Sequence, residues 1–477
     1  ISACLVGSEM CIRDRPCCIG RSLRVFSIII PTYNSEKYIA HTLDKLLSCL
    51  YFEEDEIIVI NDGSTDSTAQ ILKGYQNHAQ IKIINQTNKG VSAARNLGMS
   101  LMSPETKLVT FIDDSDYVST NFFKEASRFF LKYPYIKLAS APILIRKGHT
   151  LSAQNLNYRF QQRRHVVDIT QQYQDIQYHI GGMVFRKSLF THHKYTFDET
   201  IDFWEDAKFI NTILLDVKSY GLIKHVNYFY NRDDYRSLSI NSWKDQNRYA
   251  PHIVKNYLEL IQRSTDLYGR VLPYIQYLVV LHYLNYILEH NQGYLNLKYI
   301  QDNTRFNIET KVLLQYISIE MIDALPIDNC YKHILYQHKG MVFPAEKDYK
   351  KINIIVHHYH WGSRELHFSL SQEAFDMSDS TQIYIDSHGK LKARAMLIHD
   401  KPLIILGVKV KNFSRKTFQI RLPRYRLLIG GYFRIIDNER GVKMNIYNPS
   451  LGMRMLKKLM YSIKYYSVSS RRNKEVS

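Results

Sequence analysis

Cysteine is scarce in this sequence outside its first residues. Of the six cysteines in 477 residues, four lie within the first eighteen positions, and only Cys49 and Cys330 follow. Disulfides are common in small secreted domains and rare in the cytosol, so this usage predicts a reduced, cytoplasmic protein. The opening ISACLVGSEMCIRDR lacks the apolar core and the cleavage site of a signal peptide and resembles a translated sequencing adapter. We therefore exclude residues 1–22 from the fold prediction as an artefactual terminus.

Glycine and proline are also few, and no apolar run is long enough to cross a bilayer. The chain has 20 glycines and 12 prolines, a composition that excludes collagen-like repeats and low-complexity disorder. A transmembrane helix needs about 20 mostly apolar residues, whereas the best stretch, 274–288, contains Gln276, His282 and Asn285. We predict a buried helix there, and any contact with an anionic membrane would be peripheral, through basic side chains.

Acidic residues are outnumbered by basic ones. The chain has 63 Lys and Arg residues against 45 Asp and Glu residues, which gives a formal net charge of +18. Such a charge favours encounter with polyanions such as nucleic acid, anionic lipid or phosphate-rich polymer, although it also fits a plain solvated surface. None of the usual nucleic-acid recognition motifs is visible in the sequence, so no nucleic-acid partner is predicted.

Four strand–loop–helix units follow one another in the first third of the chain. Each begins with a short apolar run and continues through a polar loop into a helical pattern; the runs are VFSIIIP at 25–31, EIIVI at 56–60, IKIIN at 81–85 and KLVTFI at 107–112. Four such units predict an α/β fold with a Rossmann-like, mixed but mostly parallel sheet. A nucleotide-sized crevice is expected at the carboxyl ends of its strands.

The later part of the chain changes character twice. Residues 243–347 have helical apolar spacing, whereas residues 348–450 form short alternating runs bounded by turn residues. After an α/β domain at 23–242, we therefore predict a helical linker domain and a small β-sandwich-like domain. The basic tail, 451–477, is interleaved with apolar residues and indicates an amphipathic helix.

Polar clusters stand where the predicted strands of the first domain end. In a parallel sheet these ends meet at one edge. The densest cluster is Asp113, Asp114 and Asp116, whose charges repel one another unless a cation lies among them. Carboxylates suit Mg²⁺ or Mn²⁺, and these ions keep positions open for phosphate oxygens. The alternative interpretation is a solvated acidic turn.

Four motifs in a fixed order carry a resemblance to a known family. They are PTYN at 31–34, NDGS at 61–64, NxGxSxARNxG at 88–98 and FIDDSDYV at 111–118. Together they resemble the family 2 glycosyltransferases with the GT-A fold, over about residues 25–240. The resemblance implies a nucleotide-sugar donor, usually a uridine diphosphate (UDP) sugar, and inversion at the anomeric carbon.

The same resemblance implies roles for residues of the donor site. It places Pro31 and Tyr33 beside the nucleobase, Asp62 at the base or ribose, and Asn88 with Arg95 near the ribose and diphosphate. These roles are chemically sensible, because a guanidinium grips phosphate oxygens bidentately and a carboxylate accepts from N–H and hydroxyl donors. A plain surface ion pair is the alternative interpretation of Arg95.

The metal motif departs from the family pattern of Asp-x-Asp followed by another Asp. Ser115 stands at the usual second ligand position. We predict Asp113 and Asp116 as ligands of Mg²⁺ or Mn²⁺, with Asp113 also part of the donor site. Asp114 or a water molecule is the alternative to Asp116.

The segment FDETIDFWEDAKF at 197–209 resembles the part of the family that holds the catalytic base. Glu205 and Asp206 match an acidic pair at the start of a helix, and Asp206 is the predicted base. An acidic pair that only complements the dipole of a helix N-terminus is the alternative. Further along, Arg232 matches a basic segment that closes over the diphosphate in the family.

The order of the domains, together with the positive charge, resembles enzymes that decorate wall teichoic acid or extend capsule. We therefore predict transfer of a hexose or N-acetylhexosamine to a glycan or polyol-phosphate polymer of the bacterial surface, at the inner face of the cell membrane. Homo-oligomerisation through the C-terminal region is a further expectation. The alternatives are polyol-phosphate or nucleotidyl transfer on the same fold, and a catalytically impaired carbohydrate-binding scaffold.

Overall fold

The chain divides into two compact units, Ile1–Val280 and Leu281–Ser477. The computed structural model describes residues 26–191, 195–233, 242–301, 304–344, 354–370, 380–387, 390–422, 424–425, 431–438 and 441–448. The predicted domain boundaries at 242 and 347 stay predictions. The predicted helix in the basic tail lies outside the described residues.

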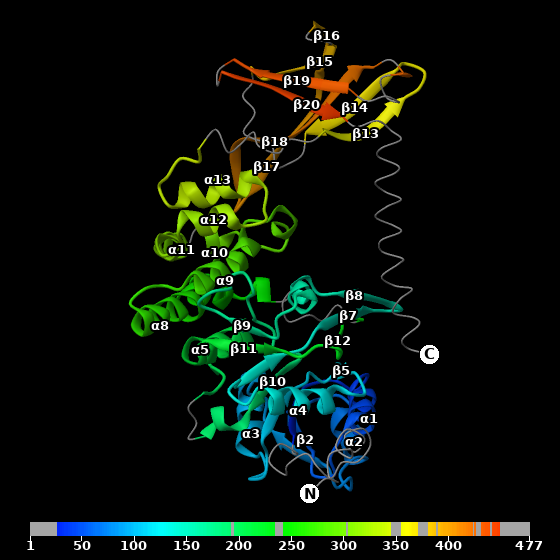
Figure 1. Cartoon of the computed structure of the whole chain (residues 1–477), viewed down its shortest axis with the longest axis vertical. Coiled ribbons are helices and arrows are strands. Elements are labelled where there is room, and N and C mark those ends of the chain that lie inside the picture. Colours follow the sequence, from blue (N-terminus) through cyan, green and yellow to red (C-terminus); the bar gives the residue numbers. More distant parts are fainter. Residues whose placement is uncertain are drawn as a thin grey trace, which may run out of the picture. The chain divides into compact units, whose positions relative to one another are not determined.

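An eight-stranded mixed sheet organises the first unit (Figure 1), in the order β3-β2-β1-β4-β10-β6-β11-β9. The first four strands in this order pair in parallel, whereas β10 pairs antiparallel with both β4 and β6. The bounds are β1 (Phe26–Thr32), β2 (Glu56–Asp62), β3 (Ile81–Gln86), β4 (Leu108–Phe111), β6 (Leu138–Ser140), β9 (Val166–Asp168), β10 (Met183–Arg186) and β11 (Ser219–Leu222). The mixed, mostly parallel α/β sheet predicted from the sequence is thereby confirmed.

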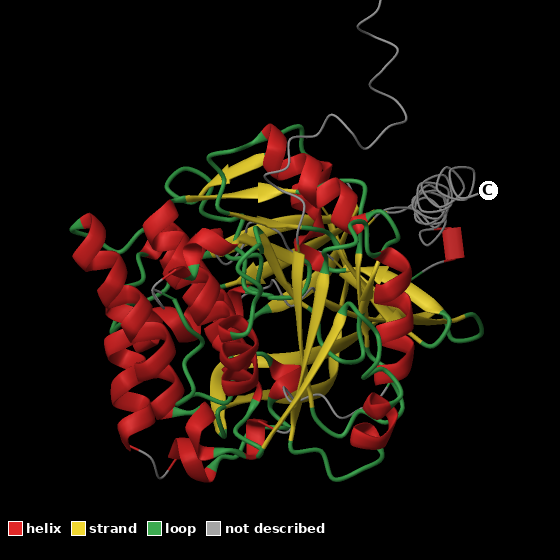
Figure 2. Cartoon of the chain, turned by 90° about the horizontal axis from the view of Figure 1, so that it is seen from below, coloured by secondary structure: helices red, strands yellow, loops and turns green. Residues whose placement is uncertain are grey.

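Helices cover both faces of the parallel strands (Figure 2). Successive side chains of a strand point to opposite faces. Ile57 and Val59 of β2 therefore join the core formed with α1 (Ile39–Cys49), α2 (Thr68–Lys73) and α4 (Phe122–Lys132), whereas Ile58 and Ile60 pack against Ala94 of α3 (Val91–Ser100). Because both faces are covered, β1 and β2 are buried along their whole length and read as continuous apolar runs.

A second, four-stranded sheet of the first unit has the order β5-β12-β7-β8. Its strands are β5 (Tyr117–Val118), β7 (Ile143–Lys147), β8 (Thr150–Ala153) and β12 (Tyr228–Asn231). β5 begins just after the acidic cluster and pairs with β12. This pairing brings Tyr228 and its neighbours to the acidic loop from far along the chain.

Helices complete the first unit beyond the large sheet. They are α5 (Glu205–Val217), α7 (Ala250–His252), a π-helix (Ile253–Leu258) and α8 (Glu259–Tyr268), with short 3-10 turns at Ser242–Lys244 and Gln246–Arg248. α9 (Pro273–Tyr283) spans the boundary between the units, and a 3-10 turn (Leu284–Tyr286) follows it. These two elements form the buried helix predicted at 274–288. In the described part of the chain, no helix is long and apolar enough to cross a membrane.

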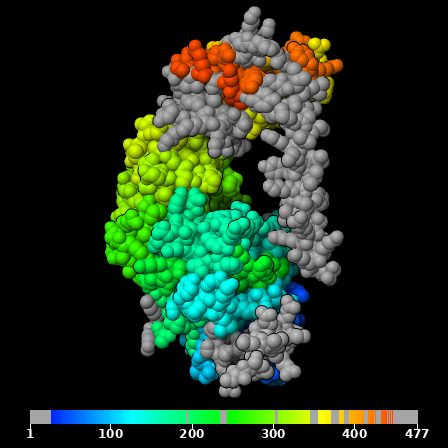
Figure 3. All heavy atoms as spheres, viewed as in Figure 1, coloured from blue at the N-terminus to red at the C-terminus, as the bar shows by residue number. Residues whose placement is uncertain are grey.

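The second unit begins with short helices and continues into antiparallel strands. The helices are α10 (Lys298–Gln301), α11 (Thr304–Gln315), α12 (Ile319–Ala324) and α13 (Asn329–His338), and in the space-filling view their side chains form a continuous surface (Figure 3). The strands form two four-stranded sheets, β13-β14-β18-β17 and β16-β15-β19-β20. Their bounds are β13 (Ile354–His360), β14 (Glu365–Leu370), β15 (Gln382–Ser387), β16 (Lys390–Arg394), β17 (Met396–Ile405), β18 (Val408–Arg421), β19 (Gly431–Asp437) and β20 (Val442–Asn448).

One apolar core joins these two antiparallel sheets. The ring of Phe368 on β14 lies 5.7 Å from that of Phe418 on β18 and 5.2 Å from that of Phe433 on β19, which belongs to the other sheet. Contacts of this kind between the inner faces of two sheets define a sandwich. The helical region followed by a β-rich domain was correctly predicted.

Candidate active site

The loops after the parallel strands are bonded to one another at one edge of the large sheet. Thr32, the last residue of β1, donates from its hydroxyl to Asp114 Oδ2 at 2.9 Å. The Asn34 N–H donates to Ser64 Oγ at 3.0 Å, and Asn34 Oδ1 accepts from the Thr65 N–H at 2.7 Å. The loops after β1, β2 and β4 therefore form one polar surface at the carboxyl ends of the strands, where α/β folds bind their ligands.

Asp62, at the end of β2, holds the loop that follows β3. Its Oδ1 accepts from Gln86 Nε2 at 2.6 Å and from the Lys89 N–H at 2.8 Å, and its Oδ2 accepts from the Gly90 N–H at 2.9 Å. Only one lone pair, on Oδ2, is left over by these bonds. A base or ribose contact of Asp62 would therefore share the carboxylate with this loop.

Gly63 lets the loop after β3 come close to β2. Its φ is +70°, and a Cβ built on it would lie 2.7 Å from the Asn88 backbone nitrogen. We expect Gly63→Ala to lower the free energy of unfolding by more than about 1–2 kcal/mol, the cost of a left-handed L-residue alone. We also expect weaker UDP binding, because Asn88 must move. Denaturant unfolding and calorimetric titration with UDP measure the two effects.

Gly148 offers a matched control for this prediction. Its φ is +55°, but nothing lies within 4 Å of a Cβ built on it. Gly148→Ala therefore carries the backbone strain without the contact. Equal losses of stability and of UDP binding in the two variants would show that the approach of Asn88 to Gly63 has no role.

Arg95, on α3, lies among three carboxylates, and its side chain is only 3% exposed. Its Nη2 donates to Asp113 Oδ1 at 3.0 Å, its Nη1 donates to Glu205 Oε1 at 3.0 Å, and Nη1 lies 3.8 Å from Asp206 Oδ1. Burial opposes the charge of Arg95, but the three carboxylates outweigh it and raise the pKa of Arg95 above its usual range. The structure thus brings together residues that the sequence assigned separately to the donor, the metal and the base.

The two acids at the start of α5 differ in pKa. Burial, followed by the charge of Asp206, raises the pKa of Glu205 to about 8. Burial also acts on Asp206, but Arg95 and a hydrogen bond with Glu205 outweigh it and hold the pKa of Asp206 below its usual range. Near neutral pH, Asp206 is therefore ionised and Glu205 protonated, so Asp206 is the member of the pair that can accept a proton.

Asp116 is fully buried, and both of its carboxylate oxygens are engaged. The Tyr228 hydroxyl donates to Oδ2 at 2.7 Å, and the Asn231 N–H donates to Oδ1 at 2.9 Å. Burial raises the pKa of Asp116 well above its usual value. Because the Ser115 hydroxyl also donates to Oδ1, at 3.4 Å, only one lone pair of this buried predicted metal ligand, on Oδ2, is left for a cation.

Asp113 is the better placed of the two predicted metal ligands. Its side chain is 40% exposed, and only its Oδ1 is paired with Arg95. Among the described residues, no group of three or more His, Cys, Asp or Glu side chains is arranged to hold a metal ion. One accessible carboxylate fits a cation such as Mg²⁺, which commonly takes one or two protein carboxylates and completes its shell with phosphate oxygens and water.

Tyr228 is a part of this site that the sequence did not reveal. Its hydroxyl donates to Asp116 and accepts from the Asp113 N–H at 3.3 Å. A Cβ on Gly181 would lie 2.7 Å from Tyr228 Cε1, and a Cβ on Gly182 would lie 3.2 Å from Tyr228 Cβ. The glycine pair was the only local signal, and it did not indicate which side chain needed the space.

His179 is a second residue that the sequence analysis missed. Burial lowers the pKa of His179 to about 4, and the nearby charge of Asp206, which acts in the opposite direction, does not offset this. The adjacent Ile180 N–H donates to Asp206 Oδ2 at 3.3 Å. A neutral imidazole, which can both donate and accept a hydrogen bond, therefore lies beside the ionised acid.

The remaining predicted donor residues lie at or near the same edge. Pro31 is buried within β1, whereas Tyr33, in the loop that follows, is 48% exposed. Asn88 and Arg232 are both exposed, and the Arg232 guanidinium lies 5.2 Å from the centre of the Tyr230 ring. Tyr33, Asn88 and Arg232 are thus open to a ligand, and Pro31 can offer only its backbone.

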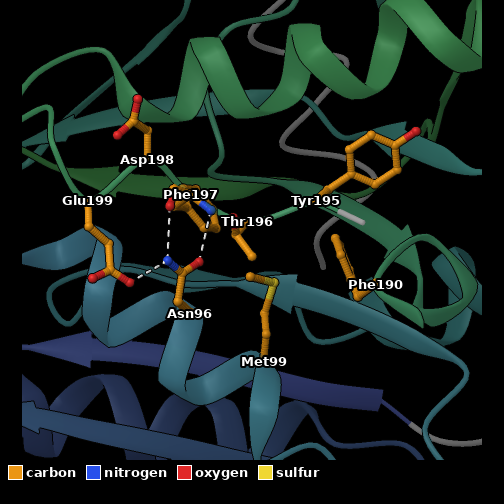
Figure 4. A pocket seen from close by; sticks show the side chains of 8 residues that line it. All are labelled: Asn96, Met99, Phe190, Tyr195, Thr196, Phe197, Asp198 and Glu199. Atoms are coloured by element: carbon orange, nitrogen blue, oxygen red, sulfur yellow. Dashed lines mark hydrogen bonds between the residues drawn. The ribbon is translucent and has the colours of Figure 1, made fainter. Parts of the chain in front are cut away.

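A pocket of about 520 Å³ is lined in part by residues 197–199, which precede the acidic pair (Figure 4). Glu205 and Asp206 are not among its lining residues. The Asn96 side chain donates to the Phe197 carbonyl at 2.9 Å, accepts from the Phe197 N–H at 2.8 Å and donates to Glu199 at 2.8 Å. The residues that line the pocket are Asn96, Met99, Phe190, Tyr195, Thr196, Phe197, Asp198 and Glu199. Because the carboxylates around Arg95 are not among these residues, we place the chemistry at the Arg95 cluster and assign the pocket no part in it.

A mostly parallel sheet with helices on both faces, and acidic and basic residues gathered at the carboxyl ends of its strands, is the arrangement expected of a glycosyltransferase of the GT-A fold. Residues 27–193 match the glycosyl transferase family 2 domain. The chain is 30% identical over 412 residues to the minor teichoic acid biosynthesis protein GgaA of Bacillus subtilis, a match that covers 84% of this chain and 92% of GgaA. The chain therefore belongs to glycosyl transferase family 2.

Two further comparisons concern one protein of Staphylococcus aureus. The chain is 38% identical over 106 residues to the poly(ribitol-phosphate) beta-N-acetylglucosaminyltransferase TarS, which covers 22% of this chain and 18% of TarS. The crystal structure of TarS aligns with a TM-score of 0.53 at 15% identity, covering 88% of this chain and 77% of TarS. At this identity the structural alignment shows a shared fold and nothing more.

Proposed function

We propose that this glycosyltransferase transfers a hexose or N-acetylhexosamine, with inversion, from a UDP-sugar to a polymer of the bacterial cell surface. The observation that supports this most strongly is the buried Arg95 paired with Asp113, Glu205 and Asp206. This cluster places an ionised acid next to a strong cation at the edge where the donor is expected. An acceptor hydroxyl and a diphosphate leaving group need these two kinds of group.

Asp206 is the proposed general base. Inversion in a single displacement requires one carboxylate to take the proton of the acceptor hydroxyl as its oxygen attacks the anomeric carbon. Arg95 keeps Asp206 ionised before the attack. Glu205, which is protonated, keeps the pair at one negative charge and can donate a hydrogen bond.

The exposed side chains of the edge are proposed to hold the donor. Tyr33 offers an aromatic face for a nucleobase, and Asn88 offers donor and acceptor groups for the ribose. Arg232 offers a guanidinium for the diphosphate. The remaining lone pair of Asp62 is left for the base or ribose.

We further propose that Asp113 binds Mg²⁺ or Mn²⁺ together with the diphosphate of the donor, with Asp116 as the second ligand through the remaining lone pair of its Oδ2. When bound, such an ion would neutralise the charge of the departing nucleotide diphosphate. Arg95 holds Asp113 in place for this role by donating a hydrogen bond to Asp113 Oδ1.

The proposed acceptor is a polyol-phosphate polymer of the teichoic acid type. The +18 formal charge favours encounter with such a polyanion, and the names of GgaA and TarS connect these relatives to teichoic acid and to poly(ribitol-phosphate). We also propose that sugar transfer takes place at the inner face of the cell membrane, and that the chain forms homo-oligomers through its C-terminal region.

Incubation with a panel of nucleotide sugars and Mn²⁺ tests the proposed function, with released nucleotide diphosphate as the measured product. We expect release from a UDP-sugar, and more of it when a polyol-phosphate polymer is added. Product analysis by NMR then reports inversion or retention at the anomeric carbon. No release with any donor would contradict the proposal and favour a scaffold, whereas polymer extension without sugar transfer would favour a polyol-phosphate transferase.

A further inference from the structure

The backbone just before the acidic pair adopts an unusual conformation. Trp204 has φ +66° and ψ +22°, in the left-handed region that L-residues other than Asn and Asp rarely adopt. Trp204 directly precedes α5, and its carbonyl accepts from the Lys208 N–H at 3.1 Å in the first turn of that helix. The dihedral angles of Trp204 therefore set the direction in which Glu205 and Asp206 leave the loop.

Aromatic packing fixes the side chain of Trp204. The residue is 8% exposed, and its indole packs edge-on against Tyr257, with ring centroids 5.1 Å apart and an interplanar angle of 89°. The His252 ring lies 5.8 Å from the indole on the same helical segment. A left-handed tryptophan persists only where its surroundings hold it, and residues held in this way are concentrated at functional sites.

A hydrogen bond fixes the backbone one residue earlier. Asn256 is fully buried and donates from Nδ2 to the Phe203 carbonyl at 3.0 Å. The guanidinium of Arg248 lies 3.9 Å from the centre of the Phe203 ring. The segment that leads into the acidic pair is thus held by both its backbone and its rings.

The π-helix Ile253–Leu258 explains how two consecutive residues, Asn256 and Tyr257, can both face the segment that leads into the acidic pair. In an α-helix, residues three and four positions on face a given side chain, but the residue five positions on does not. Here His252 contacts residues at both spacings. Its Nδ1 lies 2.6 Å from Nδ2 of Asn256, four positions on, and its ring centroid lies 4.7 Å from that of Tyr257, five positions on. The i→i+5 bonding of a π-helix widens the turn and brings both to one face.

We propose that Asn256 and Trp204 are positioning residues, through which the π-helix fixes the orientation of the Glu205–Asp206 pair. The inference rests on the proposed role of Asp206 as base. Neither Asn256 nor Trp204 is assigned a contact with the substrate. Their effect is on geometry, and a displacement of about 1 Å in a reacting group is enough to slow a reaction by roughly 100-fold.

Asn256→Ala tests the proposal with two independent measurements. We expect kcat to fall by roughly 10- to 100-fold, with the KM for the UDP-sugar and the calorimetric affinity for UDP unchanged. We also expect faster hydrogen–deuterium exchange in peptides that cover residues 205–209, because the first turn of α5 loses its support. The exchange measurement needs no turnover, so it tests the support even if no donor is found and the proposed function fails.

Ser264→Ala is the matched control. Ser264 lies on α8, which continues directly from the π-helix, is fully buried, and accepts the Leu272 N–H at 2.9 Å. Ser264→Ala removes this hydrogen bond and the longer one that the Ser264 hydroxyl donates to the Arg270 carbonyl at 3.4 Å, and neither bond involves residues 203–206. We therefore expect unchanged kcat and unchanged exchange at 205–209. Equal effects of the two variants, or an unchanged kcat and exchange in Asn256→Ala, would overturn the proposal.

Trp204→Phe provides a second test if Asn256→Ala folds poorly. Phenylalanine keeps a buried aromatic ring against Tyr257, so we expect most of the kcat to remain, whereas Trp204→Ala should lose it with UDP affinity retained. A Trp204→Ala enzyme as active as Trp204→Phe would also overturn the proposal.

Discussion

Asp206→Asn is expected to lose turnover and to keep the donor. A positioned general base contributes roughly 10²- to 10⁴-fold to the rate, so the rate of sugar transfer should fall by that factor. Asparagine has nearly the same shape but cannot take a proton from the acceptor hydroxyl. UDP affinity, measured by calorimetry, should stay unchanged, because Asp206 is proposed to act on the acceptor and not on the nucleotide.

Two variants of the same segment serve as controls for this result. Glu205→Gln should cost far less than Asp206→Asn, because Glu205 is already protonated near neutral pH and glutamine resembles the neutral acid. Asp202→Asn changes an exposed carboxylate four residues before Asp206 and should leave the rate unchanged. If Asp206→Asn retains its turnover, or Glu205→Gln is the more damaging change, Asp206 is not the base.

Arg95→Ala is expected to be the most destabilising single change in the site. It leaves Asp113, Glu205 and Asp206 close together without their cation. Breaking a buried ion pair by removing one partner costs about 3–5 kcal/mol, and we expect a loss of that size in the free energy of unfolding at neutral pH, together with loss of turnover. Arg95→Lys keeps the charge but cannot reach both sides at once, so it should recover stability only in part.

The destabilisation of Arg95→Ala should depend on pH. Without Arg95, the folded-state pKa of Asp206 rises above its unfolded value of about 4. The deficit is therefore complete at pH values above the raised folded pKa of the variant and shrinks as the pH falls through that value. It disappears only below the lowered folded pKa that Asp206 has in the unmodified protein. Urea unfolding of both proteins between about pH 4 and pH 8 measures this difference, and a deficit that is independent of pH would contradict the carboxylate origin.

Arg128→Ala provides the comparison for an exposed arginine. Arg128 pairs with Glu125 at 2.7 Å one helical turn away, and its side chain is 54% exposed. Exposed pairs contribute about 0.2–1 kcal/mol, so its removal should change stability little at any pH. A similar loss in Arg128→Ala and Arg95→Ala would show that burial of the Arg95 cluster is not what makes it important.

The fold was predictable from the sequence because its signals are local. Each βα unit contains its own apolar run and its own loop, and the burial of both faces of β1 and β2 is visible as an uninterrupted stretch such as FSIII. The Arg95 cluster was predictable in part, because the motifs that contain Arg95 and Asp113 lie at strand ends and helix starts that a parallel sheet brings together. What the sequence could not give was their pairing.

The supports of the site were not predictable because they join residues far apart in the chain. Tyr228 and Asp116 are 112 residues apart, and their contact depends on the pairing of β5 with β12. No local pattern shows that Tyr228 donates to an acid or that Gly181 makes room for its ring. Likewise, the sequence contains no sign that Trp204 is left-handed, since the ring that its indole packs against, Tyr257, lies in a π-helix 53 residues further along the chain.

The three hydrogen bonds to Asp62 have a consequence for the thermodynamics of nucleotide binding. They hold the loop after β3 in place within the folded protein, so the conformational entropy of that loop is lost on folding and not on binding. A nucleotide that meets this loop finds its donors and acceptors already arranged. The affinity of the edge for a nucleotide should therefore carry little ordering cost from residues 86–90, and a change that frees this loop would weaken binding without removing any contact to the ligand.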